Sequence, residues 1–99
     1  MSIKQSMRDI DRAVGDVLGN HGRYEAERGG RSQRRAYEKT IEEVREVAGE
    51  TEAERLATWI ETTVRDKKKL PSSRRVRKEG AEICRDVGVS VSTNDWLGA

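Results

Sequence analysis

The chain has 99 residues, a net charge of +2 and 33% hydrophobic residues, so it can form one small domain with a thin core. Its single cysteine, Cys84, excludes an internal disulfide, and one cysteine with one histidine argues against a cysteine-based zinc site. No run approaches the roughly 18 apolar residues of a membrane span, and the first residues lack the apolar core of a signal peptide. We therefore expect a cytoplasmic protein without metal, cofactor or membrane segment.

Apolar residues at helical spacing predict the first helix over Ile3–Leu18. This stripe follows steps of four and three residues: Ile3, Met7, Ile10, Val14 and Val17. Gly19 provides a helix end, and we interpret Gly15 inside the helix as the mark of a close crossing with a neighbouring helix. The same stripe could instead pair with its copy in a homodimer.

Residues 19–33 form a predicted loop, rich in glycine and arginine, that we expect to be flexible. A short helix around Arg23–Arg28 is the alternative. The segment Arg28–Arg31, followed by Arg34 and Arg35, is an arginine–glycine element. Such an element can follow a nucleic-acid backbone or remain a solvated loop.

The second and third helices are predicted from the same periodicity. The second covers Ser32–Ala48 and stops at Gly49. The third begins at Thr51, where Glu54, three residues later, forms a capping box. Pro71 disfavours helix at the residue before it and therefore sets the boundary after this helix.

The fourth helix is predicted between a serine cap and Gly88. Ser72 or Ser73 caps its start. Its buried stripe again steps by four and three residues: Val76, Gly80, Ile83 and Val87. A short fifth helix starts from Ser92 or Thr93. The sequence therefore predicts an all-α domain that includes residues 1–99, a compact bundle of four helices plus a short C-terminal helix.

Eight basic residues stand within the fourteen positions from Arg65 to Lys78, and only Asp66 opposes them. The segment carries +7, which leaves −5 on the rest of the chain. The natural partner of such a field is a polyanion, and the helix start after Pro71 also favours anions. We predict phosphate contacts from these residues: Arg74, Arg75, Arg77 and Lys78, supplemented by Lys67, Lys68 and Lys69. A solvated connection between helices is the alternative.

The segment from Ile83 to Leu97 reads as a helix end, a tight turn at Gly88 and a second short helix. This pattern resembles the helix-turn-helix motif of DNA-binding transcription regulators over residues 82–97. The resemblance implies that Ile83 and Val87 pack inward and that Gly88 takes the left-handed turn conformation. Other positions that it places against the core are Cys84, Val89 and Leu97. In this family the start of the second helix enters the major groove, which on this chain makes the candidates Ser90, Val91, Ser92, Asp95 and Trp96.

The leading interpretation is a small nucleic-acid-binding protein, preferentially DNA-binding, that contacts phosphates through the basic segment 65–78. The alternative is a protein-interaction module, a small inhibitor or adaptor, that docks through this segment or through the acidic helix face of residues 42–54. An enzyme is not expected, because the chain has no glycine-rich phosphate loop and few large apolar residues to build a pocket. Trp96 has three open roles: closing the core, stacking on a base, or anchoring a partner chain.

Overall fold

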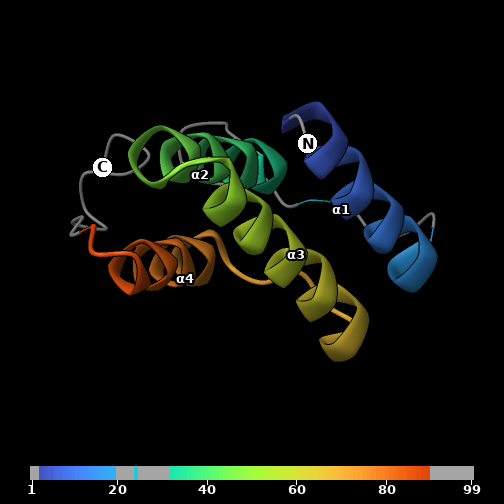
Figure 1. The fold of residues 1–99 in the computed structure, drawn as a ribbon. Coiled ribbons are helices and arrows are strands. Elements are labelled where there is room, and N and C mark those ends of the chain that lie inside the picture. Colours follow the sequence, from blue (N-terminus) through green and yellow to red (C-terminus); the bar gives the residue numbers. More distant parts are fainter. Residues whose placement is uncertain (1–2, 20–23, 25–31, 90–99) are drawn as a thin grey trace.

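The computed structural model describes residues 3–19, 24 and 32–89. Four helices make up this part of the chain (Figure 1): α1 (Ile3–Leu18), α2 (Gln33–Ala48), α3 (Glu50–Lys67) and α4 (Ser73–Asp86). No strand occurs among the described residues, which confirms the prediction of an all-α fold class. The fifth helix expected from Ser92 or Thr93 lies outside the described residues. Within them, every helix is too short or too polar to cross a membrane.

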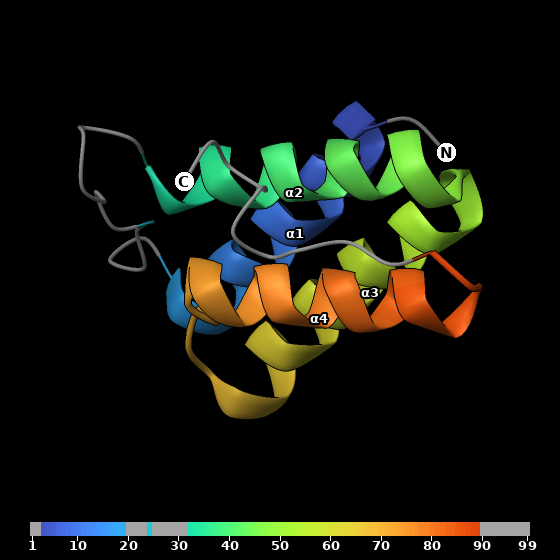
Figure 2. The ribbon, with the colours of Figure 1, turned by 90° about the vertical axis from the view of Figure 1, so that its left-hand side faces the viewer.

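Helix α3 runs through the middle of the molecule, with α1 on one flank and α4 on the other (Figure 1). Helix α1 packs mainly against α3, whereas α4 packs against both α2 and α3. Helices α2 and α4 lie side by side and run in the same direction, as Figure 2 shows. The start of α4 therefore lies next to the start of α2.

One cluster of apolar side chains forms the core between the four helices. Met7 and Ile10 of the predicted first stripe are fully buried in it. Other large side chains that are fully buried there are Tyr37, Ile41, Leu56 and Ile60. Each such side chain stabilises the fold by about 1.5–3 kcal/mol relative to exposure. The stripe of α1 packs into or against this core. Cys84 belongs to the same cluster, and burial raises the pKa of its thiol.

Two expectations about packing are wrong. Val87 was expected to pack inward, but it is 46% exposed, because α4 ends at Asp86 and Val87 already belongs to the turn. Gly15 was expected to mark a close crossing, but it is exposed and a Cβ added there would meet nothing within 4 Å. Gly15 therefore faces solvent and no neighbouring helix approaches it.

Serine side chains cap the starts of two helices. Ser32 Oγ accepts the backbone N–H of Arg35 at the start of α2, at 3.3 Å. Ser72 Oγ accepts the backbone N–H of Arg75 at the start of α4, at 3.1 Å. Each bond satisfies one of the amides that a helix start leaves without a partner. The Ser72 cap is one of the two alternatives that the sequence predicts.

The capping box predicted at Thr51 and Glu54 is wrong. Helix α3 begins at Glu50, so Thr51 already lies in its first turn, and the preceding Gly49 has no side chain to accept a bond. Gly49 has a φ of 106°, and its N–H donates to the Arg45 carbonyl at 3.0 Å to end α2. One glycine thus ends α2 and precedes α3, which leaves no position for a separate capping residue.

The carbonyl of Pro71 ties the α3–α4 connection to α2. Tyr37 Oη and Gln33 Nε2 both donate to this oxygen, the latter at 3.1 Å, and all three residues are buried. The connection starts at Lys68, which ends α3 in the left-handed conformation with a φ of 55°. Two donors satisfy the buried acceptor, and they fix where α4 starts beside α2.

Replacing Tyr37 by phenylalanine should lower the free energy of unfolding by about 1 kcal/mol, because it removes a buried hydrogen bond and keeps the ring. Urea denaturation followed by circular dichroism measures this loss. Tyr24→Phe is the matched control, since the hydroxyl of Tyr24 bonds a part-exposed carboxylate and its loss should cost less. An unchanged denaturation midpoint for Tyr37→Phe would contradict the role given to the Pro71 contact.

Candidate nucleic-acid interface

The predicted basic segment includes the end of α3, the connection and the start of α4. Lys67, Lys68 and Lys69 are exposed where α3 ends. The negative pole of the helix dipole favours cations at this end. None of the three lysines forms an ion pair within the described part of the chain. Their charge is therefore presented to solvent.

Three exposed cations form a row along α4: Arg74, Lys78 and Arg85. Steps of four and seven residues place them on one side of a helix with about 3.6 residues per turn. Arg77 lies beside this row and is half-buried. None of the four forms an ion pair with another described residue. We call these four residues the α4 basic face.

Two acidic residues of α4, Glu79 and Asp86, lie on another side of the helix, whereas Glu82 follows Lys78 by four residues and lies beside the row. Asp86 Oδ2 is 3.5 Å from Arg55 Nη2, so this side of α4 is turned toward α3. Glu79 shares that side, because it precedes Asp86 by seven residues. Burial, together with the negative charge of Glu82, raises the pKa of Glu79. Glu82 is thus the acidic neighbour of the α4 basic face, but no carboxylate of α4 forms an ion pair with these cations.

Two cations of the predicted segment have protein partners instead. Arg65 Nη2 lies 3.3 Å from Asp16 Oδ2 in α1, and Arg65 Nε lies 3.7 Å from Glu61 Oε1. The guanidinium carbon of Arg75 lies 5.8 Å from the ring centroid of Trp59 in α3, within the range of a cation–π contact. Arg75, a predicted phosphate contact, is thus directed toward α3 and away from the α4 basic face.

Sequence reasoning missed Arg85, which follows Lys78 by seven residues on the same side of α4. A linear reading of charge ends the basic segment at Lys78, because Glu79 follows it. A helical projection at about 100° per residue would have found Arg85, because it places this residue within about 20° of both Arg74 and Lys78.

The turn after α4 contains the left-handed glycine that the helix-turn-helix resemblance implies. Gly88 has a φ of 83°, and the N–H of Val89 donates to the Cys84 carbonyl at 2.9 Å. Such a turn also ends helices in proteins that bind no DNA, so the motif stays a prediction. The predicted groove contacts Ser90 and Ser92 lie outside the described residues.

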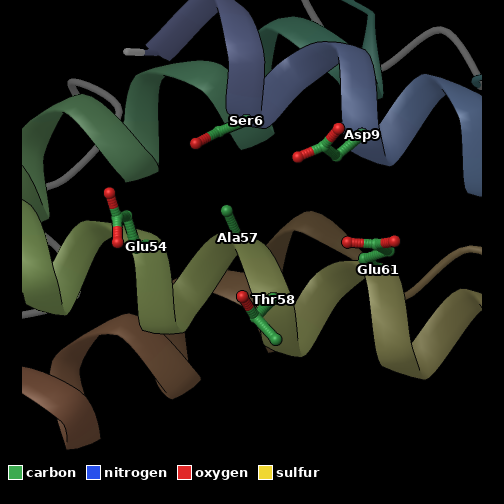
Figure 3. Close-up of a pocket in the computed structure, with 6 residues that line it drawn as sticks. All are labelled: Ser6, Asp9, Glu54, Ala57, Thr58 and Glu61. Carbon is green, nitrogen blue, oxygen red and sulfur yellow. The ribbon is translucent and has the colours of Figure 1, made fainter. Parts of the chain in front are cut away.

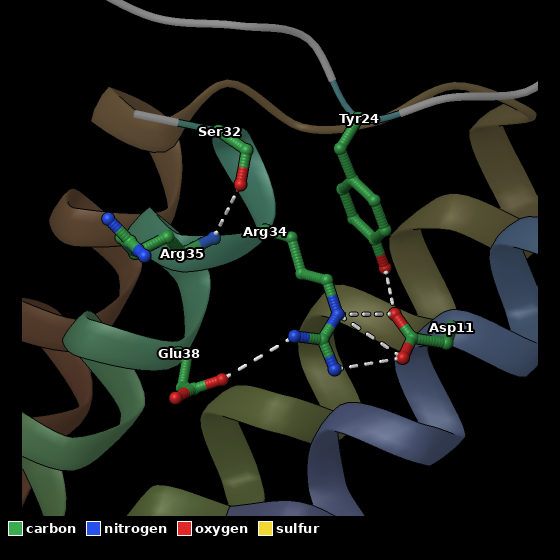
Figure 4. Close-up of polar contacts among 6 residues, drawn as sticks. All are labelled: Asp11, Tyr24, Ser32, Arg34, Arg35 and Glu38. Atoms are coloured by element: carbon green, nitrogen blue, oxygen red, sulfur yellow. Dashed lines mark hydrogen bonds and ion pairs between the residues drawn. The ribbon is translucent and has the colours of Figure 1, made fainter. Parts of the chain in front are cut away.

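Asp11 neutralises Arg34, which the sequence placed in a second basic element (Figure 4). Arg34 Nε and Nη2 donate to the two carboxylate oxygens at 2.9 and 3.0 Å, in the fork geometry typical of arginine. Tyr24 Oη donates to Asp11 Oδ1 at 2.7 Å. Burial alone would raise the pKa of Asp11, but these hydrogen bonds outweigh it and hold the pKa below the usual 3.8. The rest of that basic element, Arg28–Arg31, lies outside the described residues.

A small hollow between α1 and α3 is lined partly by carboxylates (Figure 3). Its lining residues are Ser6, Asp9, Glu54, Ala57, Thr58 and Glu61. The hollow measures ≈ 20 Å³, which is room for about one water molecule. In the described part of the chain, no three His, Cys, Asp or Glu side chains cluster closely enough to hold a metal ion. With this volume, the hollow is too small to bind an organic substrate.

Comparison of the chain with protein-family models, with curated protein sequences and with solved structures finds no match. The functional interpretation therefore depends on the geometry and the charges of the described residues.

Replacing Asp11 by asparagine should lower the free energy of unfolding at pH 7 by up to about 1 kcal/mol, because Arg34 loses a charged partner at a part-exposed site. The pKa of Asp11 is lower in the folded protein than its ordinary value. Its carboxylate therefore stabilises the fold above about pH 4, and this contribution is lost as the pH falls through the folded pKa. The difference between wild type and variant should shrink at lower pH.

Urea unfolding at pH 7 and at pH 3 measures this difference. Asp66→Asn is the control, because Asp66 is exposed and forms no ion pair with another described residue. The control should differ little from wild type at pH 7. A difference for Asp11→Asn that stayed constant or widened at pH 3 would contradict the assignment.

Proposed function

We propose that the protein binds nucleic acid, DNA in the first place, through the phosphate backbone. The proposed contact surface is the α4 basic face, with Lys67, Lys68 and Lys69 as a supplement. One observation carries the proposal: these cations form no ion pair in the described part of the chain, whereas Asp86 of α4 pairs with Arg55 of α3. A polyanion supplies the missing counter-charge.

The place of the cations within α4 also supports anion binding. Arg74, Arg77 and Lys78 stand in the first two turns, and the first turn contains no acidic residue. The positive pole of the helix dipole lies at this end, so each cation there opposes the dipole by about 0.3–1 kcal/mol. A phosphate group near the start of α4 would offset this repulsion. The arrangement is poor for helix stability and well suited to a polyanionic ligand.

The proposed binding is mainly electrostatic. Arginine and lysine side chains that contact phosphates position a protein on a duplex without reading its sequence. Reading of bases would need further groups, for which Ser90 and Ser92 remain the candidates, and a role in transcription regulation depends on them. A cytoplasmic location is part of the same proposal.

The alternative function, a protein-interaction module, is favoured by the acidic side of α2. Glu42 and Glu46 are exposed one turn apart, and neither forms an ion pair with another described residue. A basic surface on a partner protein would fit this side. A gel-shift experiment that found no binding to duplex DNA at low salt would favour this alternative.

A fluorescent duplex titrated at several salt concentrations tests the DNA-binding proposal. Replacing Arg74, Lys78 and Arg85 together by alanine should weaken binding by at least about tenfold. The slope of log affinity against log salt concentration should fall by about 2–3, because each lost phosphate contact accounts for about 0.9. All three side chains are exposed, so the variant should keep its fold, which circular dichroism checks.

The matched control removes the same charge from arginines that already have carboxylate partners. It combines Arg45→Ala, Arg55→Ala and Arg65→Ala, and we call it the paired-arginine variant. This variant should keep most of the affinity and the salt slope. Equal losses in both variants would show that binding follows net charge alone, and affinity that ignored salt would contradict the proposal altogether.

A further inference from the structure

Helix α1 carries a second row of exposed cations. Lys4, Arg8 and Arg12 repeat every four residues over about 12 Å of helix, and all three are exposed. None of them forms an ion pair with another described residue. We call these three residues the α1 basic face.

Asp11 follows Lys4 by seven residues and Asp16 follows Arg12 by four, so both carboxylates lie beside this row, but each pairs with an arginine of another helix. Asp11 binds Arg34 of α2 at 2.9 Å, and Asp16 binds Arg65 of α3 at 3.3 Å. Asp9 lines the hollow between α1 and α3 (Figure 3). The nearby carboxylates are therefore already paired, and the cations of the α1 basic face have no ion pair among the described residues, as is the case for the α4 basic face.

The two basic faces point away from each other. Helices α1 and α4 lie on opposite flanks of α3 (Figure 1). The buried side of α4, including Val76 and Cys84, packs toward the core, so the α4 basic face points outward on its own flank. The buried side of α1, including Met7 and Ile10, packs toward the core, so the α1 basic face points outward on the far flank. One straight duplex cannot lie along both faces.

We propose that the protein holds two nucleic-acid duplexes at once, one on the α1 basic face and one on the α4 basic face. This inference rests on the proposed function, because it needs the α4 basic face to bind a duplex. The ligand on both faces is the phosphate backbone, which is the same on every duplex. A single chain would then link two duplex segments and raise the local concentration of one beside the other.

A two-duplex capture experiment measures this bridging directly. A biotinylated duplex on beads is mixed with the full chain and with a fluorescent duplex of the same length that lacks biotin. At low salt the wild-type protein should retain at least about tenfold more fluorescent duplex than beads without protein. The titration includes protein concentrations below that of the duplexes. With excess protein, each duplex would be bound by a different protein molecule and no bridging would be seen.

The variant that tests the α1 basic face combines Lys4→Ala, Arg8→Ala and Arg12→Ala. It should reduce retention to the background level, while its affinity for a single short duplex changes by less than about threefold. The paired-arginine variant loses the same charge and should still bridge. Circular dichroism checks that both variants keep the helical fold.

The outcomes separate this inference from the proposed function. A wild-type protein that binds one duplex but never captures a second would overturn the bridging, and so would a variant of the α1 basic face that bridged normally. A variant that bridged normally would indicate that a protein dimer links the duplexes through another surface, and light scattering would detect such a dimer. The wild-type protein could fail to capture a second duplex and yet bind phosphatidylserine vesicles. If the variant of the α1 basic face then lost vesicle binding, the α1 basic face would be reassigned to lipid. Unchanged duplex affinity after removal of Arg74, Lys78 and Arg85 would instead overturn the proposed function.

Discussion

The surface that α4 presents depends on one buried acceptor, the carbonyl of Pro71. Tyr37 and Gln33 of α2 donate to this oxygen, and Ser72 caps the helix directly after it. A shift of α4 by one residue would rotate every side chain by about 100°. Arg74 would then point where buried Ser73 points now, or where Arg75 points now, toward Trp59. The hydrogen bonds to the Pro71 carbonyl thus determine which charged side chains of α4 are exposed.

A second constraint is the way in which acids are distributed between helices. Ion pairs connect α1 to α2 through Asp11, α1 to α3 through Asp16, and α3 to α4 through Asp86. Exposed pairs of this kind contribute at most about 1 kcal/mol each to stability. Their larger effect is on the surface, because every carboxylate directed at a neighbouring helix leaves cations elsewhere without counter-charge. A chain with a net charge of only +2 can in this way expose two rows of cations that form no ion pair among the described residues.

The helices could be predicted from the sequence because apolar side chains spaced three and four residues apart have to face one core. Local chemistry also predicted the Ser72 cap and the end of α2 at Gly49. The cap at Thr51 could not be predicted correctly, because it depends on where the preceding helix ends. Val87 was misplaced for a similar reason: periodicity continues through a helix end that only the turn geometry reveals.

The candidate site was predictable only in part. Charge density along the chain identified the segment around Pro71, but it could not show which cations have partners. Arg65 meets Asp16 across 49 positions of sequence, and Arg75 meets the ring of Trp59 on a different helix. These contacts exist only after the helices pack. Arg85 could have been found, since its place in the row needs only the helical repeat.

Because Cys84 is buried, the reactivity of its thiol can be used to measure opening of the core. This is the single thiol of the chain, it lies in the core on α4, and burial disfavours the thiolate that alkylating reagents attack. Alkylation therefore requires α4 to open, and its rate measures how often that happens. The same helix carries the α4 basic face. A duplex bound to this face would stabilise α4, and alkylation of Cys84 would then be slower.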